Sequence, residues 1–164
     1  GEILTEGPVI TQFMVDQNPG STLAPANGTL ARARLQEWLG YINSELHKTY
    51  SPLFYPTTPE ETKKDRAEYL KKRYALIEKQ LAKTTFLTGD TFTIADAYLF
   101  TVTNWARLVK LDLSEFPKLM AFQEHVAARP AVQRGVAVLA DARRPITDDK
   151  SREVLFGKTQ YEKR

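Results

Sequence analysis

The segment from Ala97 to Leu108 is apolar on nearly every side of a helix, and this feature constrains the fold more than any other. Its large side chains include Leu99, Phe100 and Trp105. A helix that is apolar all round is stable in water only when other elements surround it. No apolar run in the chain approaches the ~18 residues of a membrane span. We therefore expect this helix to be buried in the middle of a helical bundle.

The residues before this segment predict how its helix begins. Thr93 and Asp96 have the spacing of a capping box, in which Thr93 caps the first turn and the carboxylate of Asp96 reaches back. Phe92 precedes the box and can pack over the first turn as a hydrophobic staple. The helix should therefore begin directly after Thr93.

Two long amphipathic helices are predicted between residues 35 and 81. The first should stop or kink before Pro52, because the residue before a proline avoids the helical conformation. Thr58, Pro59 and Glu61 have the form of a second capping box, which opens the next helix. The apolar positions at helical spacing are Leu35, Trp38, Leu39, Ile42 and Leu46 in the first helix and Ala67, Leu70, Tyr74, Ile77 and Leu81 in the second. We expect the two helices to be antiparallel neighbours.

Shorter helices complete the predicted fold. The sequence around Pro8 has the form of a helix start, with Thr5 as the cap and Glu6 in the first turn. Pro117 and Pro130 should each begin a helix nearer the C-terminus. The sequence contains no convincing pair of alternating strands and no repeat of fixed period. We therefore predict an all-α helical bundle of about six or seven helices.

Composition limits the chemistry of the chain. Its 164 residues suit one domain, and the absence of Cys excludes disulfides, zinc-thiolate sites and a cysteine nucleophile from this chain. Residues 141–164 hold seven basic and five acidic residues and so supply +2 of the net charge of +3. Because no basic stripe interleaved with aromatic residues is present, the sequence gives little support to nucleic-acid binding through this tail.

One polar cluster stands out on the first long helix. Glu45, His47 and Lys48 are followed by Tyr50, and an imidazole beside an ammonium group can receive a carboxylate or stabilise a thiolate. The alternative is a solvated helix end with an ordinary surface histidine, which composition alone favours. Trp105 is most simply a core residue on the same grounds. Known metal, phosphate and nucleophile motifs are absent, so motifs alone predict no complete active site.

Several segments, in the same order along the chain, resemble the glutathione S-transferase family. The capping box and its helix resemble the start of the central helix in the C-terminal domain of that family, and the cluster around His47 resembles the bacterial beta class. The segments that carry the resemblance are residues 4–10, 44–54, 87–100 and 128–133. The similarity covers residues 2–140 and leaves out the charged tail.

The resemblance implies a domain organisation. Residues 1–17 would be the last helix of a thioredoxin-like N-terminal domain, and residues 18–27 a linker. Residues 28–140 would form the helical C-terminal domain, and residues 141–164 a charged tail.

The resemblance also implies binding residues. The glutathione-binding residues would be Thr5, Glu6, Gly7, Glu45, His47 and Lys48, and the residues of the electrophile pocket would be Tyr50 and Trp105. Glu6 would hold the ammonium group of the γ-glutamyl end and the helix N-terminus its carboxylate. Glu45 would reach toward the glutathione of a second subunit. Thr93 and Asp96 would be structural, and no catalytic residue and no metal ligand is expected in the chain.

The implied activity is conjugation of the glutathione thiolate to small hydrophobic electrophiles, by a cytoplasmic homodimer that contacts neither nucleic acid nor membrane. Glutathione would be a co-substrate, and no cofactor is expected. The groups nearest the thiol belong to the N-terminal domain of the family, so we expect these 164 residues alone to be inactive or nearly so. The start at Gly1 leaves three explanations open: a fragment, preceding residues that are not represented, or a shortened relative. The rival function is a non-catalytic interaction or stress-response module on the same fold.

Overall fold

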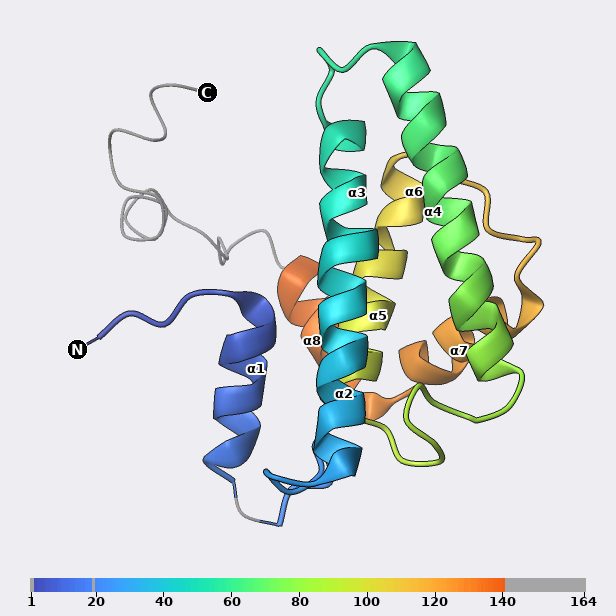
Figure 1. Cartoon of the computed structure of the whole chain (residues 1–164). Helices are drawn as coiled ribbons and strands as arrows, with labels where there is room; N and C mark the ends of the chain where they lie inside the picture. Colours follow the sequence, from blue (N-terminus) through green and yellow to red (C-terminus); the bar gives the residue numbers. More distant parts are fainter. Residues whose placement is uncertain (1, 19, 141–164) are drawn as a thin grey trace. The chain divides into compact units, whose positions relative to one another are not determined.

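The computed structural model describes residues 2–18 and 20–140, and α-helices account for most of them (Figure 1). The α-helices are α1 (Gly7–Asp16), α2 (Leu30–Tyr41), α3 (Lys48–Tyr50), α4 (Glu60–Leu81), α5 (Ile94–Thr103), α6 (Trp105–Leu108), α7 (Pro117–Ala127) and α8 (Pro130–Ala140). A π-helical segment, Ile42–His47, joins α2 to α3 without a break, and a 3-10 turn, Ser51–Phe54, follows. With residues 30–50 counted as one helix, the described residues form seven α-helices and no strand, which confirms the all-α prediction.

The chain divides into two compact units. The larger unit, Glu6–Val126, contains α1 to α6 and all but the last residue of α7. The other unit comprises Gly1–Thr5 and Ala127–Arg164; its described residues contain α8, which begins at Pro130 as predicted. The domain boundaries inferred from the sequence stay predictions, and the predicted charged tail, 141–164, lies outside the described residues.

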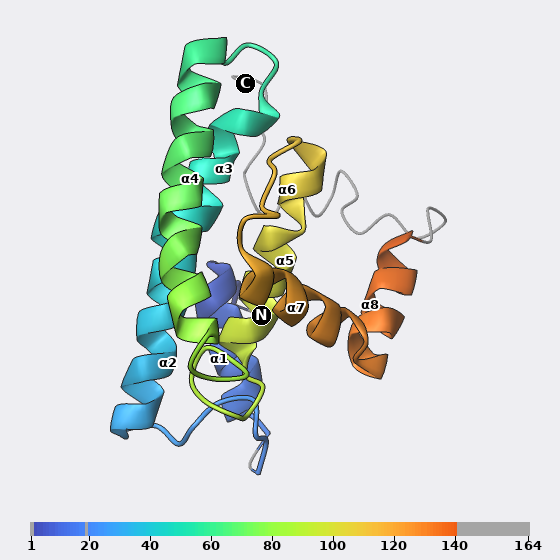
Figure 2. The ribbon, with the colours of Figure 1, turned by 90° about the vertical axis from the view of Figure 1, so that its right-hand side faces the viewer.

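The continuous helix over residues 30–50 and α4 are antiparallel neighbours, as predicted (Figures 1 and 2). The buried apolar residues of these two helices are Leu35, Leu39, Ile42, Leu46, Tyr50, Leu70, Tyr74, Ile77 and Leu81. The first helix ends before Pro52, as its sequence indicates. The predicted capping box at Thr58 is wrong, since α4 begins at Glu60 with Pro59 as its N-cap residue. The backbone of Pro59 is non-helical, with ψ 143°, so the first helical residue is Glu60 and Thr58 lies one residue before the capping position.

Helix α5 contacts α2, the π-helical segment and α6, and six of its ten residues are buried. The prediction of one buried helix as far as Leu108 is wrong at its C-terminal end. The helix is interrupted at Asn104, whose side-chain amide donates to the carbonyl of Phe100 at 3.0 Å. The backbone amide of Asn104 donates to the same carbonyl at 3.1 Å, so Asn104 closes the last turn of α5 as its C-cap residue. Leu108 consequently lies in a separate short helix and is 72% exposed.

The capping box at the start of α5 is confirmed. The Asp96 carboxylate accepts hydrogen bonds from the amide and hydroxyl of Thr93, each at 2.8 Å. Its other oxygen accepts from the amide of Leu87 at 2.9 Å. The fully buried Asp96 therefore joins the preceding loop to the first turn of the central helix.

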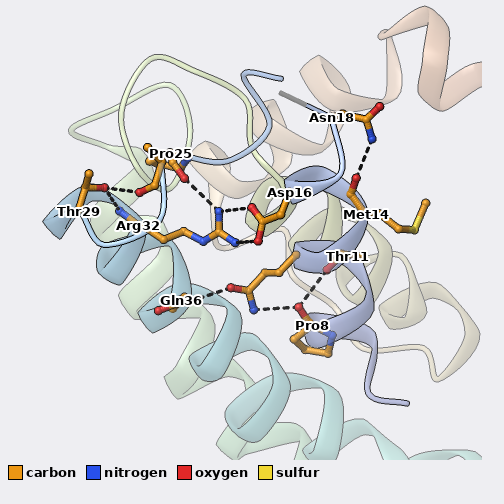
Figure 3. A network of polar contacts seen from close by, with 11 residues as sticks. Pro8, Thr11, Met14, Asp16, Asn18, Pro25, Thr29, Arg32 and Gln36 are labelled. Carbon is orange, nitrogen blue, oxygen red and sulfur yellow. Dashed lines mark hydrogen bonds and ion pairs between the residues drawn. The ribbon is translucent and has the colours of Figure 1, made fainter. Parts of the chain in front are cut away.

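A buried ion pair holds α1 against the start of α2 (Figure 3). Arg32 is only 3% exposed, and its two terminal guanidinium nitrogens donate to the carboxylate of Asp16 at 3.0 and 2.8 Å. One of them also donates to the carbonyl of Pro25 at 3.0 Å. Gln36 donates to the side chain of Gln12 at 2.9 Å and adds a second bridge. These contacts fix the position of α1, and with it the start of that helix, relative to α2.

Within residues 2–18 and 20–140, no helix has both the length and the apolar character needed to cross a membrane.

Candidate functional site

The start of α1 has a strained backbone. Glu6 is the N-cap residue, with φ 70° and ψ 108°, and its carbonyl accepts from the amides of Val9 and Ile10 at 2.9 Å each. Positive φ is uncommon for a residue other than glycine and is concentrated at functional sites. The predicted cap by Thr5 and the first-turn place of Glu6 are wrong, because the non-helical backbone at Glu6 moves the helix start to Gly7. Since no side chain caps α1, the positive end of its helix dipole, where the amide of Gly7 lies, favours an anion.

The π-helical segment brings two polar side chains to α5. Its wide turn is closed by the amide of Lys48, which donates to the carbonyl of Asn43 five residues earlier. The hydroxyl of Tyr98 donates to the Asn43 side-chain oxygen at 3.0 Å, and its oxygen lies 2.7 Å from His47 Nδ1. Such π-helical turns are frequent at functional sites. Asn43, Tyr98 and His47 form one connected group, which we call the His47 triad.

Aromatic rings flank the His47 triad on one side. The ring of Trp105 meets that of His47 edge to face, with 4.7 Å between the centroids. Trp105 also contacts Tyr50 at 5.9 Å and Phe54 at 5.6 Å. Tyr50 is fully buried, and its hydroxyl lies 3.0 Å from that of Tyr74. Trp105 therefore contacts both the imidazole of His47 and the buried ring of Tyr50, and Tyr50 is a core residue rather than part of an open surface.

Electrostatic effects connect Glu6 with the His47 triad. Burial and the positive charge of Lys48 lower the pKa of His47, while the negative charge of Glu6 acts in the opposite direction. Burial and the charge of Glu6 raise the pKa of Tyr98 to about 12. At neutral pH the imidazole is therefore mostly uncharged and the phenol keeps its proton.

Glu45 belongs to a different group of side chains, on the side of α4. The hydroxyl of Tyr69 donates to its carboxylate at 2.6 Å, and Arg73 Nε lies 3.4 Å from the same oxygen. The Tyr69 hydrogen bond, with smaller contributions from Ser44 and Arg73, lowers the pKa of Glu45. The Arg73 guanidinium also lies over the Tyr69 ring, 4.5 Å from its centroid. Glu45 is thus an ionised carboxylate held by α4 rather than by the imidazole of His47.

The remaining predicted site residues are placed as follows. Gly7 is the first residue of α1, and Lys48 is exposed beside His47. Thr5 is exposed and belongs to the other unit. Within the part of the chain that the structure describes, no group of three or more His, Cys, Asp or Glu side chains could hold a metal ion.

Sequence reasoning missed Asn43 and the polar role of Tyr98. Tyr98 lies within the segment from Ala97 to Leu108 that the sequence predicts to be apolar on nearly every side, and 51 residues separate it from His47 along the chain. No local pattern in the sequence signals this contact.

These features describe a helical unit in which the carboxylate of Glu6, at a helix start, acts electrostatically on the imidazole of His47, which in turn contacts the indole ring of Trp105. The chain belongs to the glutathione S-transferase family, since the family model described as glutathione S-transferase, C-terminal domain, matches residues 38–130.

Relatives support the same assignment. The glutathione S-transferase GstA of Escherichia coli O157:H7 is 45% identical over 134 residues, which make up 81% of this chain and 66% of that protein. The chain therefore spans slightly less than two thirds of the length of this relative.

Solved structures of the family are similar as well. A sphingomonad glutathione S-transferase in complex with glutathione has a TM-score of 0.83 and 41% identity, over 87% of this chain and 71% of that one. The bacterial beta-class enzyme of Sphingomonas chungbukensis has a TM-score of 0.81 and 36% identity, over 85% of this chain and 70% of that one. The chain is accordingly similar to the bacterial beta class.

Proposed function

We propose that this chain supplies the helical half of a bacterial glutathione S-transferase that conjugates glutathione to small hydrophobic electrophiles. The observation that carries the proposal is the contact of the His47 and Trp105 rings, in the same unit as the helix start at Glu6, whose charge acts on His47. A ligand with a charged amino-acid end and a thiol matches a helix start with a carboxylate, followed by an imidazole and an apolar wall.

The predicted binding residues of the unit Glu6–Val126 then have separate tasks. The ammonium group of the γ-glutamyl end binds the carboxylate of Glu6, and the carboxylate of that end binds the backbone amide of Gly7 at the start of α1. The thiol lies near His47 and Lys48. Trp105 forms the apolar wall for the electrophile, and Tyr50 supports the indole from behind.

The proposal includes a cytoplasmic homodimer. Glu45 is kept ionised and oriented by Tyr69, and its side chain is 29% exposed. A carboxylate held in this way suits a polar contact with the glutathione of a second subunit.

The test uses the protein that carries this chain in its full encoded length. It should conjugate glutathione to 1-chloro-2,4-dinitrobenzene, and His47→Ala should lower kcat/KM by about tenfold or more, as expected for loss of a group that handles the thiol proton. His125→Ala is the matched control, because it removes the other histidine, an exposed residue in the last turn of α7. Full-length protein that neither binds nor conjugates glutathione would refute the proposal and favour a non-catalytic module.

A further inference from the structure

We propose that Asn43 and Tyr98 are positioning residues that hold neutral His47 with its proton on Nδ1, so that Nε2 is the hydrogen-bond acceptor available to a ligand thiol. The thiol rests on the proposed function. The position of the proton rests on the hydrogen bonds of the His47 triad alone.

The hydroxyl proton of Tyr98 is directed to Asn43. A phenol carries one O–H and can donate only one hydrogen bond. That bond goes to the side-chain oxygen of Asn43 at 3.0 Å. The pKa of Tyr98 is raised to about 12, so the phenol keeps this proton at neutral pH.

The ring of His47 is held through its Nδ1 atom. Its Nδ1 lies 2.7 Å from the Tyr98 oxygen, which is a hydrogen-bond distance. Because the Tyr98 proton already points to Asn43, the oxygen can only accept, and Nδ1 must donate. A neutral imidazole has one N–H, so its other nitrogen, Nε2, carries a lone pair.

The backbone of the π-helical segment makes this arrangement possible. Asn43 and His47 lie at the two ends of the wide turn in the π-helical segment. Both side chains reach the same hydroxyl on α5, Tyr98, although 55 and 51 residues separate them from it along the chain. The Trp105 ring, in edge-to-face contact with the imidazole, then limits rotation of the imidazole.

This arrangement gives His47 a defined step with a thiol. Nε2 takes the thiol proton, so that the S–H bond breaks, an N–H bond forms, and a thiolate is left beside an imidazolium. Both nitrogens of the imidazolium then donate, Nδ1 to Tyr98 and Nε2 to the thiolate. The lone pair of Nε2 is available for this step only while Asn43 holds the Tyr98 proton.

Nitrogen-15 NMR of the histidine rings tests the inference directly. The chain contains two histidines, and the His47 signals are assigned by their loss in His47→Gln. In the full chain, above the pKa of His47 and without glutathione, we expect the Nδ1–H tautomer. A proton found on Nε2 instead would overturn the inference without any further variant.

Two substitutions of Asn43 make a matched pair. Asn43→Leu removes the acceptor, so the Tyr98 proton turns to Nδ1 and the tautomer should switch to Nε2–H. Asn43→Asp keeps an acceptor oxygen and should keep the Nδ1–H tautomer. An unchanged tautomer in a folded Asn43→Leu protein would contradict the role given to Asn43.

Activity in the full-length protein separates this inference from the proposed function. Asn43→Leu should lower kcat/KM by about tenfold or more, because a base in the wrong tautomer cannot take the proton. Asn43→Asp should retain most of the activity. If the tautomers behave as expected but the full-length protein does not conjugate glutathione, the proposed function fails and the positioning role remains.

Discussion

Replacement of Asp96 is the sharpest test of how the central helix is held in place. The carboxylate is fully buried and accepts three hydrogen bonds, two of them from the backbone amides of Leu87 and Thr93. Asp96→Ala leaves both amides without this acceptor inside the protein. An unsatisfied buried donor costs about 1–3 kcal/mol, so we expect a loss of about 3–5 kcal/mol in the free energy of unfolding.

Asp96→Asn should have an intermediate effect. The asparagine oxygen can still accept on one side, but its amide nitrogen cannot accept on the other. One donor is therefore left unsatisfied, at a cost of about 1–3 kcal/mol. The expected order of stability is the original chain, then Asp96→Asn, then Asp96→Ala. Asp90→Asn is the control, because Asp90 is an exposed aspartate in the same loop and its replacement should change stability by less than about 0.5 kcal/mol.

Urea unfolding followed by circular dichroism measures these differences. Tryptophan fluorescence is a second probe, and coincident transitions would support a two-state treatment. Hydrogen exchange locates the effect, since the amides of Leu87 and Thr93 should lose protection first. If the free energies of unfolding of Asp96→Ala and of the Asp90→Asn control differ by less than about 1 kcal/mol, the reasoning is refuted.

Five further substitutions give outcomes of a defined sign. Lys48→Ala should raise the pKa of His47 and Glu6→Gln should lower it further, as measured by NMR titration; shifts of opposite sign would contradict the assigned causes. The pKa of His47 in the folded chain lies below the ordinary 6.5, so the unfolded chain binds the imidazole proton more tightly than the folded chain does. The free energy of unfolding should therefore fall as the pH drops below 6.5, and this fall should be steeper in the original chain than in His47→Gln. Glu6→Gly should relieve the positive φ and stabilise the chain by about 1 kcal/mol in thermal unfolding, while weakening glutathione binding; a destabilised variant would refute the strain at this position. Tyr74→Phe should cost about 1–3 kcal/mol, because it removes the partner of the buried Tyr50 hydroxyl, and an unchanged urea midpoint would show that this bond contributes nothing.

The sequence predicted the features that depend on neighbouring residues. The Thr93 and Asp96 box needs only a three-residue spacing, and the break before Pro52 follows from local sterics. The third hydrogen bond of Asp96, from Leu87, depends on how the loop folds back, and it was not foreseen.

Features that depend on distant residues or on unusual backbone could not be predicted. The 3.6-residue pattern of the first long helix does not reveal the π-helical turn at 42–47, because apolar residues remain at similar spacing through it. Arg32 is charged and yet buried in an ion pair with Asp16. Because Asp16 lies in another helix, the residues around Arg32 do not reveal this pair. The positive φ of Glu6 moved a helix start by one residue. The candidate site therefore combines predicted residues, such as His47, with contacts that only the folded chain provides.

Titration of glutathione into the isotope-labelled full-length protein tests the central claim most directly, namely that Glu6 and His47 belong to one glutathione site. Saturable shifts should occur together at the His47 ring and at the amides of Gly7 and Val9 in the first turn of α1, with one common affinity. The His125 ring on α7 should remain unchanged. Shifts absent from both His47 and the start of α1, or saturating there with different affinities, would contradict the account.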